Sequence, residues 1–214
     1  MTIALHCFGE SGNAYKAALP LSLSGLDWAP VFVDFFNGAA RAPEFRALNP
    51  MGEVPVLVDG DTVLTQSGVM QLYVTELTGK FGGDTDADRR DVLRWMFWDN
   101  HKLSSVAGNT RFLMNFVAPE KRPAAVIAFQ RNRLRASYDT LNRHLDGRDW
   151  IVGGGPTHAD FCCCGYLYYP EDFGFDRADW PHIAVWLDRI ANLPGWRHPY
   201  DLMPPARAEN QRNA

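Results

Sequence analysis

Polar side chains stand at the start of two predicted helices, where they could stabilise an anion. Ser11 and Asn13 follow a short apolar segment, and Gln66 and Ser67 precede a second helical segment. The first N–H groups of a helix have no partner within the helix, so they bind anions, and the helix dipole adds to the attraction. The same side chains could instead cap their helices. The residues alone leave anion binding and capping as alternatives.

The four cysteines form neither a zinc motif nor a redox motif. Cys162, Cys163 and Cys164 are consecutive, and neighbouring residues point in different directions, so they lack the spacing of zinc ligands. Cys7 has Glu10 three residues later, which excludes a Cys-x-x-Cys pair. We interpret the cysteines mostly as small buried apolar residues.

Residues 49–73 contain the strands, turn and helix that would position Gln66 and Ser67. Pro55 enters an apolar strand, Asp59-Gly60 predicts a two-residue hairpin turn, and a helix opens at Ser67. Proline donates no hydrogen bond to a sheet, so Pro55 must lie at a strand start or edge. The main chain at Val54 is therefore predicted to be available to another molecule.

The first 80 residues predict a β-α-β, α, β-β-α order, which is that of a thioredoxin-like domain. Strands are predicted over 3–8 and 31–34, joined by a helix over 14–23 and a right-handed crossover. Pro20 predicts a kink or an early end of that helix. A short helix over 42–48 precedes the hairpin, and the last helix runs to about residue 78.

The second half of the chain predicts helices only. Apolar residues recur at mostly helical spacing over 86–116 and in one stripe over 127–145. Thr157 and Asp160 have the spacing of a capping box, and Pro181 opens another helix.

The composition and net charge of the chain argue against nucleic acids and membranes as binding partners. The 214-residue chain has 46% hydrophobic and 21% charged residues and a formal net charge of −4, as an ordinary globular protein does. Nucleic acids and anionic membranes favour basic patches, so neither partner is expected. The start of the sequence is not typical of a signal peptide, and no segment has the roughly 18 apolar residues of a membrane helix. We expect a cytoplasmic protein.

The chain resembles the glutathione transferases. Five features occur in the family's order: Asn49-Pro50, Gly52, Val54-Pro55, Asp59-Gly60 and Gln66-Ser67. The Thr157–Asp160 box is similar to one in the family's sixth helix. The segment from Arg94 to Trp98, continuing to Arg111-Phe112, looks like the fourth helix of bacterial members. The likeness covers the chain to about residue 199 and is greatest to bacterial cytosolic, theta/nu-like members of the serine/asparagine type.

This resemblance implies a fold of the α/β plus all-α kind. A thioredoxin-like, glutathione-binding domain over residues 1–80 would be followed by an all-helical domain over residues 86–203.

The resemblance also implies roles for individual residues. The Val54-Pro55 peptide would be cis, and the Val54 main chain would pair with the cysteinyl part of glutathione. Ser11, or Asn13 in second place and Cys7 in third, would stabilise the thiolate. The predicted glutathione-binding residues are Arg41, Glu53, Val54, Pro55, Gln66 and Ser67. The predicted electrophile pocket lies between the domains and includes Phe8, His101 and Ser105. No metal is expected.

The implied function is conjugation of glutathione thiolate to a small hydrophobic electrophile, in detoxification, by a homodimer. Two alternatives remain open. One is a glutathione-dependent peroxidase or disulfide-bond reductase on the same fold, and the other is a non-catalytic binding module.

Overall fold

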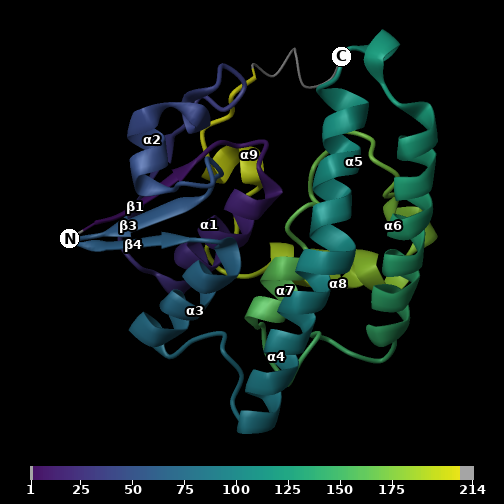
Figure 1. Cartoon of the computed structure of the whole chain (residues 1–214). Helices are drawn as coiled ribbons and strands as arrows, with labels where there is room; N and C mark the ends of the chain where they lie inside the picture. Colours follow the sequence, from purple (N-terminus) through teal and green to yellow (C-terminus); the bar gives the residue numbers. More distant parts are fainter. Residues whose placement is uncertain (1, 208–214) are drawn as a thin grey trace. The chain divides into compact units, whose positions relative to one another are not determined.

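The structure is a computed structural model that describes residues 2–207. The chain divides into two compact units (Figure 1). The first comprises the chain up to Lys80 together with the segment from Pro194, and the second runs from Phe81 to Leu193.

A four-stranded mixed sheet forms the centre of the first unit. Its strands are β1 (Ile3–Cys7), β2 (Trp28–Phe32), β3 (Val56–Asp59) and β4 (Thr62–Thr65), in the order β2-β1-β3-β4. β1 is parallel to β2 and antiparallel to β3, and β3 is antiparallel to β4. Leu5 and Leu57 face each other across the central strands and are fully buried. Burial of such apolar side chains is the main force that holds the sheet to its helices.

Helices cover both faces of this sheet. α1 (Gly12–Ser24) packs against α3 (Ser67–Thr78), while α2 (Pro43–Leu48) lies on the other side of the strands after the 3₁₀ turn η1 (Ala39–Arg41) (Figure 1). The short α9 (Pro199–Leu202) packs against α1. The predicted thioredoxin-like order is therefore confirmed.

α1 does not end early at Pro20, because the helix continues to Ser24. Proline has no N–H group, so the carbonyl of Lys16, four residues earlier, loses its usual helical donor. The amide of Gln71 in α3 donates to that carbonyl at 2.8 Å, and the Gln71 side chain is fully buried. A side chain 55 positions away thus replaces the missing donor.

The hairpin turn lies one residue later than predicted. Asp59 is still paired with Thr62, so Gly60 and Asp61 form the turn. Gly60 has φ of 56°, which glycine adopts without steric cost. The Asp-Gly pattern therefore predicted the hairpin correctly, but it placed the two turn residues one position too early.

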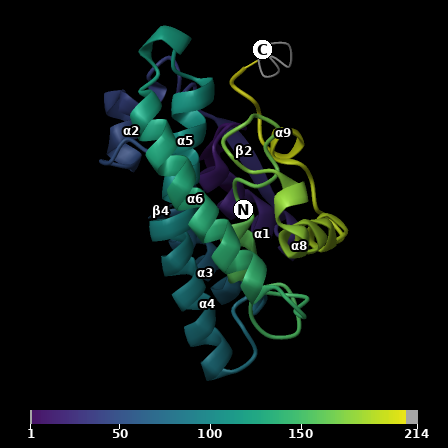
Figure 2. The same ribbon diagram turned by 90° about the vertical axis from the view of Figure 1, so that its right-hand side faces the viewer.

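The second unit is built from helices. A continuous helical run consists of α4 (Asp86–Trp98), the π-helical turn η2 (Asp99–Ser104) and α5 (Ser105–Asn115). After the 3₁₀ turn η3 (Pro119–Lys121), α6 (Ala124–His144) packs against η2 and α5. Figures 1 and 2 show this long helix beside the continuous run. α7 (His158–Cys163), the 3₁₀ turn η4 (Arg177–Asp179) and α8 (Pro181–Ala191) complete the unit.

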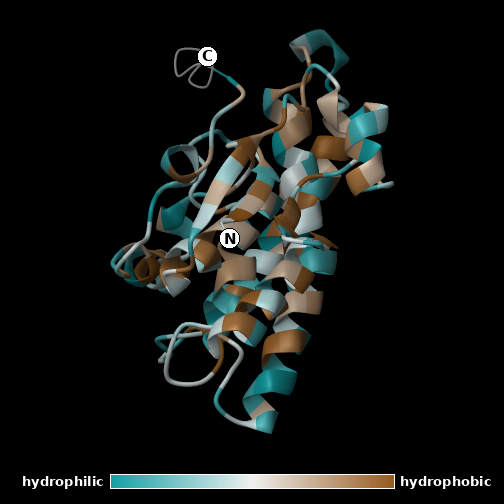
Figure 3. Ribbon diagram, turned by 90° about the vertical axis from the view of Figure 1, so that its left-hand side faces the viewer, coloured by the Kyte–Doolittle hydropathy of each residue, from teal (hydrophilic) through white to brown (hydrophobic). Residues whose placement is uncertain are grey.

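Several helices bury one face, as α8 does with Ile183, Trp186, Leu187 and Ile190, whereas α7 is buried along its whole length. Figure 3 shows hydrophobic and hydrophilic segments alternating along them, as amphipathic helices require. Within residues 2–207, no helix is both long enough and apolar enough to span a membrane.

The predicted capping box at α7 is present and buried. The carboxylate of Asp160 accepts hydrogen bonds from the N–H and hydroxyl groups of Thr157, at 2.8 and 2.9 Å. It also accepts bonds from the Ile151 N–H and the Trp186 indole N–H, both at 2.9 Å. Burial raises the pKa of Asp160, and these four donors act in the opposite direction.

Candidate functional site

The register of the sheet brings most of the predicted site residues to one end of the first unit. Cys7, the last residue of β1, pairs with Phe32, the last residue of β2. Val56, the first residue of β3, pairs with His6 and with Thr65, the last residue of β4. The segments that follow β1, β2 and β4 and precede β3 therefore share one end. They carry Phe8, Ser11, Asn13, Arg41, Glu53, Val54, Pro55, Gln66 and Ser67.

The segment before β3 leaves its main chain available. The Val54-Pro55 peptide bond is cis, as the resemblance implied. The Val54 side chain packs against a cluster that contains Val33, Ala40 and Phe45. Within the described part of the chain, no residue forms a hydrogen bond with the Val54 main chain. Its N–H and C=O groups are therefore available to an extended ligand.

Asn49 and Gly52 shape this segment, and no role for either was predicted. Asn49 is buried, donates from Nδ2 to the Glu53 carbonyl at 2.8 Å and accepts from the Met51 N–H at 3.1 Å. Gly52 has φ of 65°, and a Cβ atom there would lie 2.9 Å from the Ala40 carbonyl oxygen. Both conditions require glycine. The sequence pattern contained these residues, but only the structure shows what they do.

The start of α3 is arranged differently from a capped helix. Gln66 has φ of 68°, in the left-handed region, and neither its side chain nor that of Ser67 caps the helix. Its carbonyl accepts the N–H groups of Val69 and Met70. Among residues 2–207, no acceptor is bound to the N–H groups of Ser67 and Gly68 or to the Ser67 hydroxyl. A non-glycine residue with positive φ costs on the order of 1–3 kcal/mol and is typical of ligand sites. This helix start is thus available to an anion.

Ser11 both caps α1 and remains able to donate. Its hydroxyl oxygen accepts the Ala14 N–H at 3.1 Å, so the hydroxyl hydrogen is not used in the cap. Ser11 is 8% exposed, and its side chain has no other partner in the described part of the chain. Capping and anion stabilisation, which the sequence left as alternatives, are compatible in this geometry. Asn13, half-buried in the first turn of α1, forms no hydrogen bond through its amide within the same part.

Cys7 cannot act as a nucleophile in this structure. It is fully buried in β1, and burial raises the pKa of its thiol to about 12. The thiol is therefore protonated near neutral pH, and only the thiolate is reactive. Cys162, Cys163 and Cys164 are buried as well.

Glu10 binds the last described residues to the loop between β1 and α1, residues 8–11, which we call the Ser11 loop. Its carboxylate accepts the N–H groups of Ala206 and Arg207, both at 2.9 Å. The Gly9 N–H donates to the Pro204 carbonyl at 2.8 Å. A Cβ atom at Gly9 would lie 2.9 Å from the Pro205 main chain, so only glycine permits this approach. No sequence signal connects residues this far apart.

The structure shows few contacts that fix a role for the other predicted residues of the first unit, Arg41, Glu53 and Phe8. Arg41 is exposed at the end of η1, and the Glu53 side chain is exposed. Phe8 is buried and stacks on Phe35 with ring centroids 4.8 Å apart.

His101 and Ser105 belong to the second unit and are exposed. His101 lies in the π-helical turn η2, and Ser105 begins α5. The Ser105 hydroxyl donates to the His101 carbonyl at 3.3 Å.

No group of three or more His, Cys, Asp or Glu side chains is placed to hold a metal ion among residues 2–207. The donors at the end of the sheet are instead hydroxyl, amide and main-chain groups, which suit an anionic peptide-like ligand.

Two family models match the chain. The glutathione S-transferase N-terminal domain matches residues 1–76, and the glutathione S-transferase C-terminal domain matches residues 110–194.

The chain is also similar to individual proteins along most of its length. A crystal structure of a glutathione S-transferase from Xanthobacter autotrophicus Py2 has 33% sequence identity and a TM-score of 0.85, covering 95% of this chain and 98% of that one. Disulfide-bond oxidoreductase YfcG of Escherichia coli strain K12 is 29% identical over 194 residues, 87% of this chain and 89% of the relative. Glutathione S-transferase 3 of Zea mays is 28% identical over 205 residues, 91% of each chain. The identity to the Xanthobacter protein, its coverage and the two matching domains show that this chain belongs to the glutathione S-transferase family.

Proposed function

We propose that the protein is a glutathione transferase that adds the thiolate of glutathione to a small hydrophobic electrophile. The observation that carries this proposal is the set of unsatisfied groups at one end of the sheet: the Val54 main chain, the start of α3 and the Ser11 hydroxyl. In this proposal the cysteinyl part of glutathione pairs with Val54, and Gln66 and Ser67 bind its γ-glutamyl carboxylate. Glu53, Pro55 and Arg41 complete the glutathione contacts.

Ser11 is the proposed thiolate donor, and Asn13 is the second candidate. The free thiol of glutathione has a pKa of about 8.5, as cysteine does. Lowering this pKa by about two units requires about 2.7 kcal/mol of preferential stabilisation of the thiolate. One hydroxyl donor at a helix N-terminus supplies part of that free energy. These residue types support our assignment of the chain to the theta/nu-like, serine/asparagine members. Phe8, His101 and Ser105 are the proposed electrophile contacts.

The proposal includes two properties carried over from the family resemblance: the protein acts in detoxification and forms a homodimer. It also keeps the cytoplasmic location expected from the sequence. Sedimentation velocity tests the dimer. The domain boundaries, 1–80 and 86–203, are predictions that limited proteolysis in the segment between them tests.

Activity assays separate conjugation from the alternatives. We expect calorimetry to detect glutathione binding and chlorodinitrobenzene to be conjugated faster than hydroxyethyl disulfide or cumene hydroperoxide is reduced. Faster reduction would identify a reductase or peroxidase, in line with the name of the Escherichia coli relative. Binding without turnover of any of the three would identify a non-catalytic module. Absence of glutathione binding would contradict the proposal altogether.

A further inference from the structure

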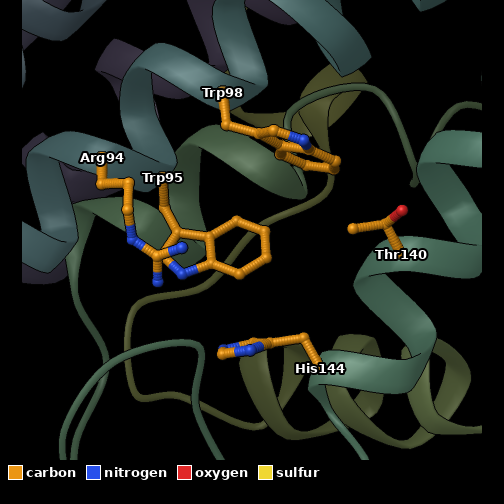
Figure 4. Close-up of a pocket in the computed structure, with 5 residues that line it drawn as sticks. All are labelled: Arg94, Trp95, Trp98, Thr140 and His144. Carbon is orange, nitrogen blue, oxygen red and sulfur yellow. The ribbon is translucent and has the colours of Figure 1, made fainter.

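Two features of the described chain are not explained by the proposed glutathione contacts. The first is a cavity of about 280 Å³ in the helical unit, lined by Arg94, Trp95, Trp98, Thr140 and His144 (Figure 4). Its polar side chains are bonded within that unit: Arg94 to Asp91, Thr140 to the Ala136 carbonyl and His144 to the Ile151 carbonyl. We therefore assign no ligand to it. The second feature is the segment 204–207, which we call the strap and which contacts the Ser11 loop.

The Ser11 loop is a tight turn. The Ser11 N–H donates to the Phe8 carbonyl at 3.1 Å, which is the bond between the first and fourth residues of a β-turn. Gly9 and Glu10 are the two central residues, and both are buried. The Ser11 carbonyl then accepts the Tyr15 N–H in the first turn of α1. The position of the Ser11 hydroxyl therefore depends on how this turn is held.

The strap binds both central residues of the turn. The Gly9 N–H donates to the Pro204 carbonyl at 2.8 Å. The Glu10 carboxylate accepts the N–H groups of Ala206 and Arg207, both at 2.9 Å. Hydrogen bonds from N–H groups to a carboxylate are stronger than those between neutral groups. The strap thus fixes the main chain and the side chain of the turn at neighbouring residues.

The strap also contacts the first residue of the turn through one ring. The guanidinium carbon of Arg207 lies 5.0 Å from the centroid of the Phe36 ring, within the range of a cation–π contact. The Phe36 ring meets that of Phe8 edge to face, with centroids 5.7 Å apart. Phe8 is the residue whose carbonyl accepts the Ser11 N–H. Both sides of the turn are therefore connected to the strap.

The strap is itself anchored by the residues that precede it. α9 packs against α1, and Leu202 and Met203 are buried. The Tyr15 hydroxyl of α1 donates to the Arg197 carbonyl at 2.9 Å. All of these residues belong to the first unit. The strap therefore extends from a packed helix and can act as a support for the turn.

The charge of Glu10 does not explain its place beside the proposed thiolate donor. A carboxylate disfavours the ionisation of a neighbouring thiol, because like charges repel each other. Glu10 directly precedes Ser11, so its charge alone would oppose formation of the thiolate. Its bonds to the strap instead give the carboxylate a structural use. The contacts of Glu10 thus favour a role in holding the turn.

We propose that Glu10 is a positioning residue for the glutathione reaction. Its bonds to Ala206 and Arg207 fix the turn, and the turn holds the Ser11 hydroxyl where the sulfur of glutathione binds. This inference rests on the proposed function, in which Ser11 donates to the thiolate. Loss of these bonds leaves the Val54 main chain and the start of α3 unchanged. It therefore raises the pKa of the bound thiol without weakening glutathione binding.

Thiolate absorbance titration of bound glutathione measures this effect in the full chain. Ala206→Pro removes one N–H donor of the strap and changes no charge, so we expect the thiol pKa to rise by about half a unit. At a fixed pH below that pKa, the thiolate fraction then falls about threefold. Ala206→Gly keeps the N–H and is the matched control, with an unchanged thiol pKa. Calorimetry should show glutathione affinities within about twofold of the unchanged protein for both variants.

Glu10→Gln separates position from charge. The glutamine keeps one acceptor oxygen, but its NH₂ group faces one of the two N–H donors, so one bond to the strap is lost. Loss of the positioning bond raises the thiol pKa, whereas loss of a nearby negative charge alone lowers it. We expect a rise. Glu76→Gln removes the same charge from an exposed position on α3 and should leave the thiol pKa unchanged.

Shortened chains test the strap as a whole. A chain that ends at Met203 lacks the strap and keeps α9, and a chain that ends at Arg207 is its control. We expect a higher thiol pKa in the first only. Because the strap acts through Ser11, ending the chain at Met203 should raise the pKa no further in the Ser11→Ala protein. Circular dichroism and melting temperature show whether each variant is folded, and the full-chain substitutions decide the matter if the shorter chain does not fold.

Three results would overturn this inference and leave the proposed function intact. They are an unchanged thiol pKa in Ala206→Pro, an unchanged or lower thiol pKa in Glu10→Gln, and a further rise when the chain ending at Met203 also carries Ser11→Ala. A protein that binds no glutathione would instead contradict the proposed function, and this inference with it.

Discussion

Replacement of Asp160 by alanine should destabilise the helical unit far more than the same change at Asp88. Both carboxylates complete a Thr-x-x-Asp capping box, at α7 and at α4 respectively. At α4 the Thr85 N–H and hydroxyl donate to Asp88 at 3.0 and 2.7 Å on exposed surface. The two boxes have the same residue types and spacing, so they differ mainly in burial.

The expected magnitudes follow from the partners that each change leaves behind. Loss of an exposed cap costs about 0.5–1 kcal/mol, because water replaces the carboxylate. Asp160→Ala also removes the acceptor of two buried donors outside the box, the Ile151 N–H and the Trp186 indole. Each unsatisfied buried donor costs about 1–3 kcal/mol, so we expect a total loss of about 3–5 kcal/mol.

The loss of stability caused by Asp160→Asn should lie between those of Asp88→Ala and Asp160→Ala. The amide oxygen of the asparagine can still accept from Ile151 and Trp186. Its NH₂ group would replace Oδ2, the atom that accepts the Thr157 N–H, so two donors would face each other there. One unsatisfied donor then costs about 1–3 kcal/mol.

Urea denaturation followed by circular dichroism measures these free energies. The slopes with urea concentration must agree among the variants for the comparison to hold. Equal losses for Asp88→Ala and Asp160→Ala would refute the argument, because the box would then act through its local hydrogen bonds alone.

Four further predictions concern both units. Gln71→Met should lower the free energy of unfolding by about 1–3 kcal/mol, measured by denaturation, because the Lys16 carbonyl beside Pro20 loses its donor; no loss would contradict that role. Burial lowers the pKa of His158 to about 3, so below pH 6.5 the unfolded chain takes up a proton that the folded chain does not. Stability should therefore fall by about 2 kcal/mol between pH 6.5 and 5, and His158→Gln should remove this part of the pH dependence; identical pH profiles would be inconsistent with it. Ser67→Ala should weaken glutathione binding in calorimetry, whereas Ser11→Ala should raise the pKa of the bound thiol by about one unit in thiolate absorbance titrations; an unchanged thiol pKa would transfer the donor role to Asn13 or the main chain.

Local patterns predicted the elements that local chemistry controls. The helix from Ser67 to Thr78 has the predicted bounds, and the box at Thr157 and Asp160 and the start of α8 at Pro181 were found from spacing alone. These features depend on residues a few positions apart, which are visible in any sequence window. The hairpin turn was displaced by one residue because Asp59 and Thr62 still pair.

Long-range contacts account for what the sequence did not reveal. Pro20 predicted a kink or an early end of α1; the helix does not end early, and the compensating amide of Gln71 belongs to another helix. The contacts of Glu10 with Ala206 and Arg207 join opposite ends of the chain, and no periodicity predicts them. The candidate site could be predicted because the family pattern around Val54 and Ser67 is local in the sequence.

The most direct test of the glutathione site is a crystal structure of the protein soaked with glutathione. Our account predicts the cysteinyl main chain paired with the N–H and C=O groups of Val54, the γ-glutamyl carboxylate at the start of α3, and the sulfur within hydrogen-bond distance of the Ser11 hydroxyl. Glutathione bound elsewhere, or a sulfur with no donor from the Ser11 loop, would contradict it.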